Sequence, residues 1–237
     1  MIVLAVRLSL ANLFAPETRK VFWKVLGLTL LALAAFWFLL RGVFNSFVLP
    51  WLQGFMPSTS DWTSWLTFFL AILAGIALAL AMALLISPVT ALIAGLFLDD
   101  VAEVVERRDY PSDPPGKAMP FAAAMKSSVR FLGVVIVGNI VALFLLFIPG
   151  VNLIAFFLVN GYLLGREFFE FAAMRFRSPE EARQFRVKHA FTVFLAGLAI
   201  AAFLAIPLLN LLTPLFAAGM MVHLHKLISR REMGLRV

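Results

Sequence analysis

Long apolar runs dominate this sequence and restrict the folds that it can adopt. Of its 237 residues, 62% are hydrophobic and 14% are charged, and the mean hydropathy is +0.97. Soluble domains carry about 25% charged residues, so this composition is typical of a chain that lies in lipid. A bilayer core offers no water to backbone groups, and a helix satisfies its own N–H and C=O groups. The sequence therefore predicts an all-α integral membrane protein with a single membrane domain over residues 1–237.

Two of the apolar runs are expected to cross the bilayer, which takes about 20 residues of helix. We place the spans at 25–41 and 65–98, and the first is long enough when its helix is counted from Pro16. A proline suits the first position of a helix, because its missing N–H has no partner there. An interfacial or cytoplasmic lead-in, 1–24, precedes the first span, and a cytoplasmic segment, 99–120, follows the second.

The pattern I-P-x-x-N-L occurs twice, at 148–153 and at 206–211, and each copy lies between two apolar runs. Pro149 and Pro207 should each end a helix, because proline lacks a backbone N–H and clashes with the preceding turn. Asn152 and Asn210 should each cap the helix that follows. The pattern predicts two Pro-broken helical hairpins, at 121–177 and 187–230. These breaks are either the tips of hairpins or the lining of an anion path, since helix N-termini attract anions.

Basic residues fall almost entirely on one side of this arrangement. If the lead-in is cytoplasmic, then of the 20 Lys and Arg residues only Arg41 lies on the opposite side. Positive loops stay in the cytoplasm, so both termini should be cytoplasmic. The same rule accounts for the net charge of +7, and we expect no nucleic-acid partner.

Four stretches carry a resemblance to a known family: P-E-T-R-K-V-F at 16–22, A-E-V-V-E-R-R at 102–108, F-I-P-G-V at 147–151 and I-P-L-L-N-L at 206–211. They resemble the CysZ-type sulfate permeases of bacterial inner membranes and the wider etoposide-induced-protein-like family. Their order and spacing cover nearly the whole chain. The resemblance implies two long transmembrane helices, two hairpins that enter the membrane part-way, and a homo-oligomer. It also implies that the protein supplies sulfate for cysteine biosynthesis.

In the family, sulfate binds at a basic pair before the first span, and that pair corresponds to Arg19 and Lys20. The alternative role for these two residues is to anchor the chain to lipid headgroups. The sequence departs from the family at Glu17, where the family has glycine, and at Lys20, where it has arginine. Glu17 brings a negative charge to the expected anion site. The alternative function is therefore a membrane scaffold or assembly factor that does not transport.

Several further residues are candidates from their spacing alone. Glu103, Glu106 and Arg107 can share a helix face and act as a charged vestibule or gate, or they form a solvated cytoplasmic face. Arg166 and Glu170 are spaced as an i,i+4 ion pair. Three further local signals are a capping box at Ser178 and Glu181, a G-x-x-x-G packing motif at Gly161 and Gly165, and two histidines, His223 and His225, that a helix sends to different faces. We expect no metal, no cofactor and no enzymatic activity, because no hydrolase, nucleotide-binding or zinc-protease motif is present.

Overall fold

The computed structural model of this protein describes residues 1–48, 50, 61–118, 129, 133, 136, 137, 140 and 151–235. Regular structure in the described residues is helical, as predicted. The main helices are α1 (Ile2–Leu13), α2 (Pro16–Val43), α4 (Asp61–Leu96), α5 (Leu98–Asp109), α7 (Val151–Met174), α8 (Pro179–Lys188), α9 (Ala190–Leu204), α10 (Pro207–Asn210) and α11 (Thr213–Glu232). A short π-helix, Phe44–Val48, extends α2.

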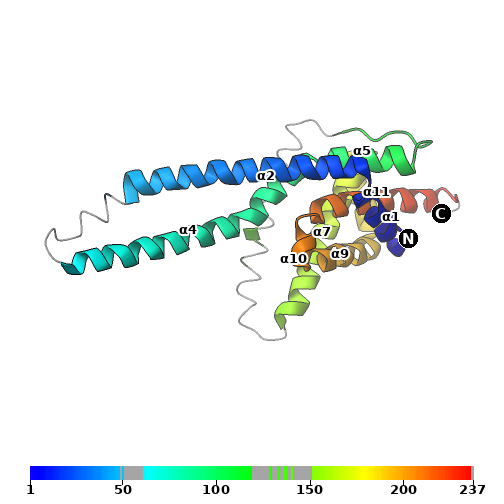
Figure 1. The fold of residues 1–237 in the computed structure, drawn as a ribbon. Coiled ribbons are helices and arrows are strands. Elements are labelled where there is room, and N and C mark those ends of the chain that lie inside the picture. The colour runs from blue at the N-terminus through cyan, green and yellow to red at the C-terminus, as the bar shows by residue number, and fades with distance from the viewer. Residues whose placement is uncertain are drawn as a thin grey trace. The chain divides into compact units, whose positions relative to one another are not determined.

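The chain divides into two compact units. Unit 1 contains Met1–Val25 and Ala91–Val237, and unit 2 contains Leu26–Thr90. Within unit 2, the remainder of α2 and most of α4 run antiparallel (Figure 1). Large apolar side chains such as Leu31, Phe38 and Leu73 are exposed on these helices. Exposed apolar surface of this extent is suited to contact with lipid.

One helix among the described residues, Pro16–Phe47, is long and apolar enough to cross a membrane. It spans 32 residues and contains the first predicted span, 25–41. It begins at Pro16 as expected, and Glu17 lies in its first turn. The second predicted span, 65–98, falls largely in α4, which is helical over 36 residues. Its passage through a membrane stays a prediction.

In unit 1 the other helices gather around α11 (Figure 1). Residues Thr213 to Ile228 of α11 are all buried, and Phe216, Met220 and Leu224 are among the fully buried side chains of the core. Helices α1, α5, α7 and α9 each contact α11. The Ser9 hydroxyl of α1 donates a hydrogen bond to the Phe216 carbonyl oxygen at 2.8 Å, which fixes the lead-in against the core. Residues far apart in the sequence therefore meet along one central helix.

Helices α7 and α9 approach closely through glycines. A Cβ atom placed on Gly197 would lie 1.8 Å from the Gly161 carbonyl oxygen, and one on Gly165 would lie 2.7 Å from the Val193 carbonyl oxygen. Neither position has room for a side chain. The expected packing role of Gly161 and Gly165 is confirmed, and α9 provides the partner.

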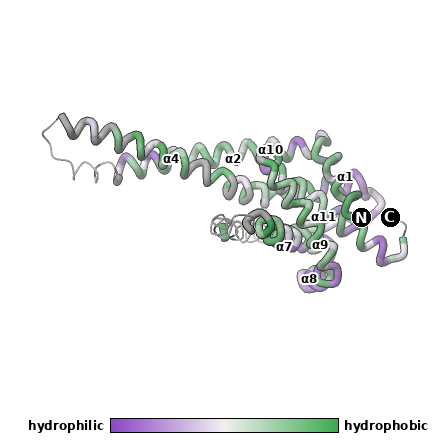
Figure 2. The backbone as a smooth tube through the Cα atoms, turned by 90° about the horizontal axis from the view of Figure 1, so that it is seen from below, coloured by the Kyte–Doolittle hydropathy of each residue, from purple (hydrophilic) through white to green (hydrophobic). Residues whose placement is uncertain are grey.

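Helix α8 connects α7 to α9 and differs from both in polarity (Figure 2). Ser178 and Glu181 form the predicted capping box, in which each side chain bonds the backbone N–H of the other residue. Helices α8 and α9 meet at His189 with a bend of 90°. The polar helix is thus turned away from the direction of the apolar helix that follows it.

The predicted helix breaks have different outcomes in the two copies of the repeat. Pro149 lies outside the described residues, and Asn152 falls in the first turn of α7, where its side chain is not described. The second break is present, because α9 ends at Leu204 and the short helix α10 begins at Pro207. The prediction that Asn210 caps the next helix is wrong. Asn210 is the last residue of α10, and α11 begins at Thr213 with Leu212 at its N-cap.

Candidate functional site

Arg19 and Lys20 lie in the first turns of α2, and both are exposed. The opposite side of this helix is buried and presents Thr18, Val21 and Val25 to the core of unit 1. One turn further along, Lys24 lies 4.0 Å from Asp100 of α5. The first turns of α2 therefore have one face fixed by packing, and the two basic side chains lie on the solvent-accessible face.

The N-terminus of α2 also offers polar groups to an anion. The N–H of Arg19 donates to the Ala15 carbonyl oxygen at 2.9 Å. Helix geometry then leaves the N–H groups of Glu17 and Thr18 as the donors available to a ligand. The Thr18 hydroxyl is buried and has no hydrogen-bond partner among the described residues. Glu17 is exposed in the same turn. Its negative charge offsets the partial positive charge at the helix N-terminus and so weakens the attraction of this end for an anion.

The charged residues of α5 separate into two groups. Glu103 and Arg107 are exposed and form an i,i+4 ion pair at 3.5 Å. Glu106 is only 5% exposed and accepts a hydrogen bond from Arg175 Nε at 2.7 Å. The expectation that these residues share one face is wrong for Glu106, because it lies on the side of α5 that packs into unit 1. A gate that uses Glu106 would first have to break this buried ion pair.

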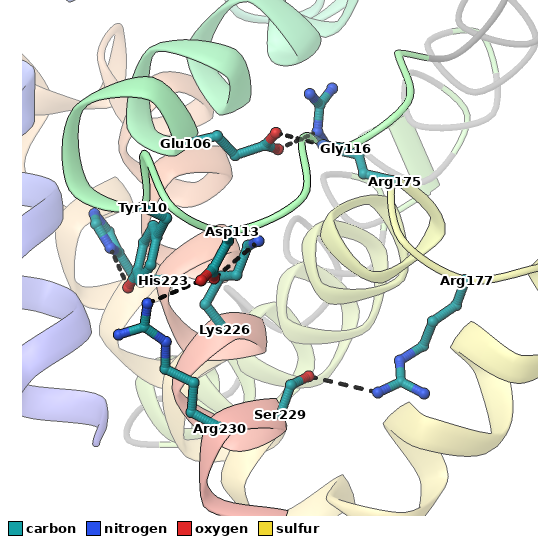
Figure 3. A network of polar contacts seen from close by, with 10 residues as sticks. All are labelled: Glu106, Tyr110, Asp113, Gly116, Arg175, Arg177, His223, Lys226, Ser229 and Arg230. Atoms are coloured by element: carbon teal, nitrogen blue, oxygen red, sulfur yellow. Dashed lines mark hydrogen bonds and ion pairs between the residues drawn. The ribbon is translucent and has the colours of Figure 1, made fainter. Parts of the chain in front are cut away.

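Arg175 joins α5 to the end of α7. It is 3% exposed and pairs with both Glu106 and Asp99. The following segment is tied to the same group, because the Gly116 N–H donates to Glu106 at 2.7 Å and the Lys117 N–H donates to the Arg175 carbonyl oxygen at 2.8 Å. A buried charge is costly unless it is paired and hydrogen-bonded, and both conditions are met here. The cluster holds segment 110–118 against α7 (Figure 3).

A second cluster forms where segment 110–118 meets α11. Asp113 lies between two cations, with Arg230 Nη2 donating to Oδ1 at 3.1 Å and Lys226 Nζ lying 3.2 Å from Oδ2 (Figure 3). Burial raises the pKa of Asp113, but hydrogen bonds from Arg230 and Lys226 outweigh burial and hold that pKa below its ordinary value of 3.8. Asp113 is therefore ionised at neutral pH, and the cluster carries one negative and two positive charges.

The Tyr110 ring adjoins this cluster and leads to a buried histidine. The Tyr110 hydroxyl lies 3.0 Å from His223 Nδ1, and Asn12 Nδ2 lies 3.1 Å from His223 Nε2. Asn12 also donates to Asp109 Oδ2 at 2.5 Å. Burial raises the pKa of Tyr110 to about 12, although Arg230 opposes the shift, so the hydroxyl stays protonated. This chain of contacts connects α1, the end of α5 and α11.

His225 is buried in a different environment from His223, as the predicted helix places it. Its ring stacks on Phe176 with centroids 5.0 Å apart, and its Nε2 accepts a hydrogen bond from Arg177 at 3.4 Å. The Arg166–Glu170 ion pair predicted from spacing is present at 3.7 Å, and Glu170 also accepts a hydrogen bond from Arg186 at 2.6 Å.

The sequence did not single out Asp113, Lys226 or Arg175 as a site. Asp113 lies in a Pro-rich loop. Arg175 is one of several basic residues in the polar stretch between two apolar runs, and nothing in the sequence distinguishes it from the others. Lys226 carried the strongest signal in the sequence, because it stands among the apolar residues of this segment, between Leu224 and Leu227. In the structure its side chain is only 8% exposed. A lysine in such a run requires a partner, but sequence spacing does not say which acidic residue supplies it.

Comparison with known proteins places these features in a family. The model of a family described as sulfate transporter CysZ/etoposide-induced protein 2.4 matches residues 5–214. The matched region begins in α1 and ends at the start of α11, so it includes Arg19, Lys20 and the charged residues of α5. No curated protein matches the chain at a significant level.

Proposed function

Because the chain belongs to the sulfate transporter CysZ/etoposide-induced protein 2.4 family, we propose that it is a membrane permease for sulfate or a closely related oxyanion. The family match, which extends over most of the chain, is the observation that carries this proposal. The four sequence stretches that resemble the CysZ-type permeases all lie within the matched region. In a bacterial cell, such a protein supplies sulfate across the inner membrane for cysteine biosynthesis.

The proposed capture site consists of Arg19, Lys20 and the free N–H groups at the start of α2. Both side chains are exposed, and no ion pair to either is found among the described residues. A guanidinium and an ammonium can hold an oxyanion through charge-assisted hydrogen bonds.

The proposed path runs from this site toward the helix breaks at Pro149 and Pro207, with Asn152 and Asn210 beside it. Glu103 and Arg107 form the charged vestibule, since they are the exposed pair on α5. Glu106 takes part in gating only if its bond to Arg175 opens. The α2 and α4 helices are the two long transmembrane helices of this arrangement, and both chain termini lie in the cytoplasm. Subunits assemble as a homo-oligomer.

Sulfate-dependent thermal stabilisation tests capture directly, because a ligand stabilises the state that it binds. Purified protein in detergent is titrated with sodium sulfate, with sodium chloride at equal ionic strength as the reference. We expect sulfate to raise the unfolding temperature of the wild type and to have little effect on Arg19→Ala. An Arg7→Ala variant, which removes an exposed arginine from α1, is the matched control and should respond as the wild type does. An equal response in Arg19→Ala contradicts the capture role.

The second candidate function is a membrane scaffold or assembly factor that shares the fold and does not transport. Glu17 favours it, because a carboxylate stands beside the N–H groups that would meet the anion. Replacing Glu17 with Gly distinguishes the two functions. If the protein is a permease with a weakened site, Glu17→Gly should bind sulfate more tightly than the wild type. If neither protein responds to sulfate or another oxyanion, the scaffold function is favoured.

A further inference from the structure

Asp113 holds the place of an anion between two cations of α11. Its Oδ1 accepts from Arg230 at 3.1 Å, and its Oδ2 lies 3.2 Å from Lys226 Nζ. The two oxygens of one carboxylate thus contact different cations, which is also how two oxygens of a tetrahedral oxyanion bind a Lys and Arg pair. One carboxylate faces two cations, so the cluster retains a net positive charge. In place of the carboxylate, a dianion such as sulfate would neutralise the two cations.

An aromatic ring packs against each of the two cations. Lys226 Nζ lies 4.2 Å from the centroid of the Phe176 ring, and the Arg230 guanidinium carbon lies 5.0 Å from that of the Tyr110 ring. The Lys226 side chain is 8% exposed, whereas those of Asp113 and Arg230 are 23% and 31% exposed. The site is therefore shielded on the lysine side and open to solvent on the side of the carboxylate and the arginine. Reduced access of water strengthens the attraction of the cations for an anion.

The loop that carries Asp113 is anchored independently of these cations. The Asp113 N–H donates to the Tyr110 carbonyl oxygen at 3.1 Å, which closes a turn with Pro111 at its second position, where proline is favoured. Further along, Gly116 and Lys117 are held by Glu106 and by the Arg175 carbonyl oxygen. The Asp113 carboxylate can therefore leave the cations by rotation of its own side chain while the loop backbone stays in place.

We propose that Lys226 and Arg230 form a binding site for a free tetrahedral oxyanion, and that Asp113 occupies this site when no ligand is present. The site lies apart from Arg19 and Lys20, since it is built from α11 and segment 110–118. The choice of sulfate as its ligand, and its location on the cytoplasmic side, rest on the proposed function. Asp113 then acts as a tethered competitor that promotes release of the anion. A lipid phosphate shares the same chemistry, so the experiment separates the two sources.

The test compares sulfate binding by the wild type and by Asp113→Asn, both in an Arg19→Ala background that removes the proposed capture site, measured as sulfate-dependent thermal stabilisation in dodecyl maltoside without added lipid. If Asp113 occupies the site about nine-tenths of the time, removing it should lower the half-saturating sulfate concentration about tenfold. Glu180→Gln is the matched control, because it removes one negative charge from an exposed position on α8. It should bind sulfate as the wild type does. Equal half-saturating concentrations in the wild type and Asp113→Asn overturn the proposal.

A second substitution assigns any gain to the cations. Adding Lys226→Gln to Asp113→Asn should abolish the gain, whereas adding Arg231→Gln, which removes an exposed cation of the same helix, should preserve it. A gain that survives Lys226→Gln overturns the proposal. Stabilisation of Asp113→Asn by phosphatidylglycerol but not by sulfate assigns the site to a lipid and overturns the proposal as well.

A third variant covers the case in which Asp113→Asn does not fold. Arg230→Gln keeps the Asp113–Lys226 pair, and it is tested by sulfate flux from the cytoplasmic side of inside-out vesicles. The half-saturating concentration should rise at least about threefold, and an unchanged value overturns the proposal. Absence of sulfate flux through the wild type would refute the proposed function instead. The binding comparison would still decide whether Lys226 and Arg230 hold an oxyanion.

Discussion

Glu106 and Arg175 show how one buried ion pair organises the polar end of unit 1. Their side chains are 69 positions apart in the sequence, and each is nearly inaccessible to solvent. Arg175 has a second carboxylate in Asp99, and Glu106 has a second donor in the Gly116 N–H. Such an ion pair adds little to the free energy of unfolding compared with an apolar pair of the same volume. Removing one partner, however, leaves the other charge buried without compensation.

We therefore expect Glu106→Gln to destabilise the protein by about 3 kcal/mol, at the lower end of the usual range because Asp99 still faces Arg175. Glu103→Gln is the matched control on the same helix. It breaks an exposed ion pair with Arg107 and should cost less than about 1 kcal/mol. Chemical unfolding in detergent measures both. Equal losses in the two variants would contradict the buried role of Glu106.

The Asp113 carboxylate should make the stability of the protein fall in acid. Hydrogen bonds from Arg230 and Lys226 hold its folded-state pKa below 3.8, despite an opposing effect of burial. A lowered pKa stabilises the fold above the unfolded-state pKa, and this stabilisation is lost as pH falls through the folded-state pKa. The unfolding temperature of the wild type should therefore fall more steeply between pH 5 and pH 3 than that of Asp113→Asn. Parallel curves for the two proteins would show that the carboxylate is not stabilised in this way.

The contact between α7 and α9 depends on the absence of side chains at three glycines. Gly161 and Gly165 of α7 meet Gly197 of α9, and the backbones are close enough that a Cβ on Gly197 would overlap the Gly161 carbonyl oxygen. Backbone approach of this kind provides extensive van der Waals contact between helices in lipid, where the hydrophobic effect does not drive association. The two helices are therefore expected to behave as one packed pair.

Gly197→Ala should push α7 and α9 apart, because backbone atoms must move to make room for the new methyl group. The free energy of unfolding should fall by about 3 kcal/mol. Gly27→Ala on α2 provides the comparison, since a Cβ there meets nothing within 4 Å. Alanine favours a helix over glycine by about 1 kcal/mol, so Gly27→Ala should be neutral or stabilising. Unfolding temperature and monodispersity in detergent report both changes. Tolerance of Gly197→Ala would show that the helices are further apart than described.

Local spacing predicted the features that depend on neighbours in the chain. Pro16 begins a helix, Ser178 caps one, and Arg166 lies one turn from Glu170, because each relation is fixed within a few residues. The cap at Asn210 was misplaced, because α10 inserts a further turn between the proline and the next long helix. Proline and asparagine mark a break, but they do not fix how many residues the break contains.

The contacts that build the polar clusters could not be predicted in this way. Asp113 and Lys226 come from opposite halves of the chain, and they meet because α5 and α11 pack together. Spacing rules relate residues on one helix and give no information about which helices are neighbours. The hydropathy pattern predicted the helical class and a first helix that is long and apolar enough to cross a membrane, while the pairing of helices in unit 1 required the structure.

The whole molecule combines a helix long and apolar enough to cross a membrane, Pro16–Phe47, with a packed, polar-ended bundle in unit 1. The family match extends across both units. In the proposed permease, α2 links them functionally, because it carries Arg19 and Lys20 at its start and continues as the first span. In this proposal, anion capture and membrane passage begin on one continuous helix.

Uptake of labelled sulfate into proteoliposomes tests this account most directly. The wild type should accumulate sulfate above the level of empty liposomes, and Arg19→Ala should reduce the initial rate about tenfold, since a charge-assisted hydrogen bond is worth about 1.5–3 kcal/mol. Arg7→Ala should retain the wild-type rate. Uptake by the wild type that equals that of empty liposomes would contradict the permease function, and equal rates in wild type and Arg19→Ala would contradict the capture site.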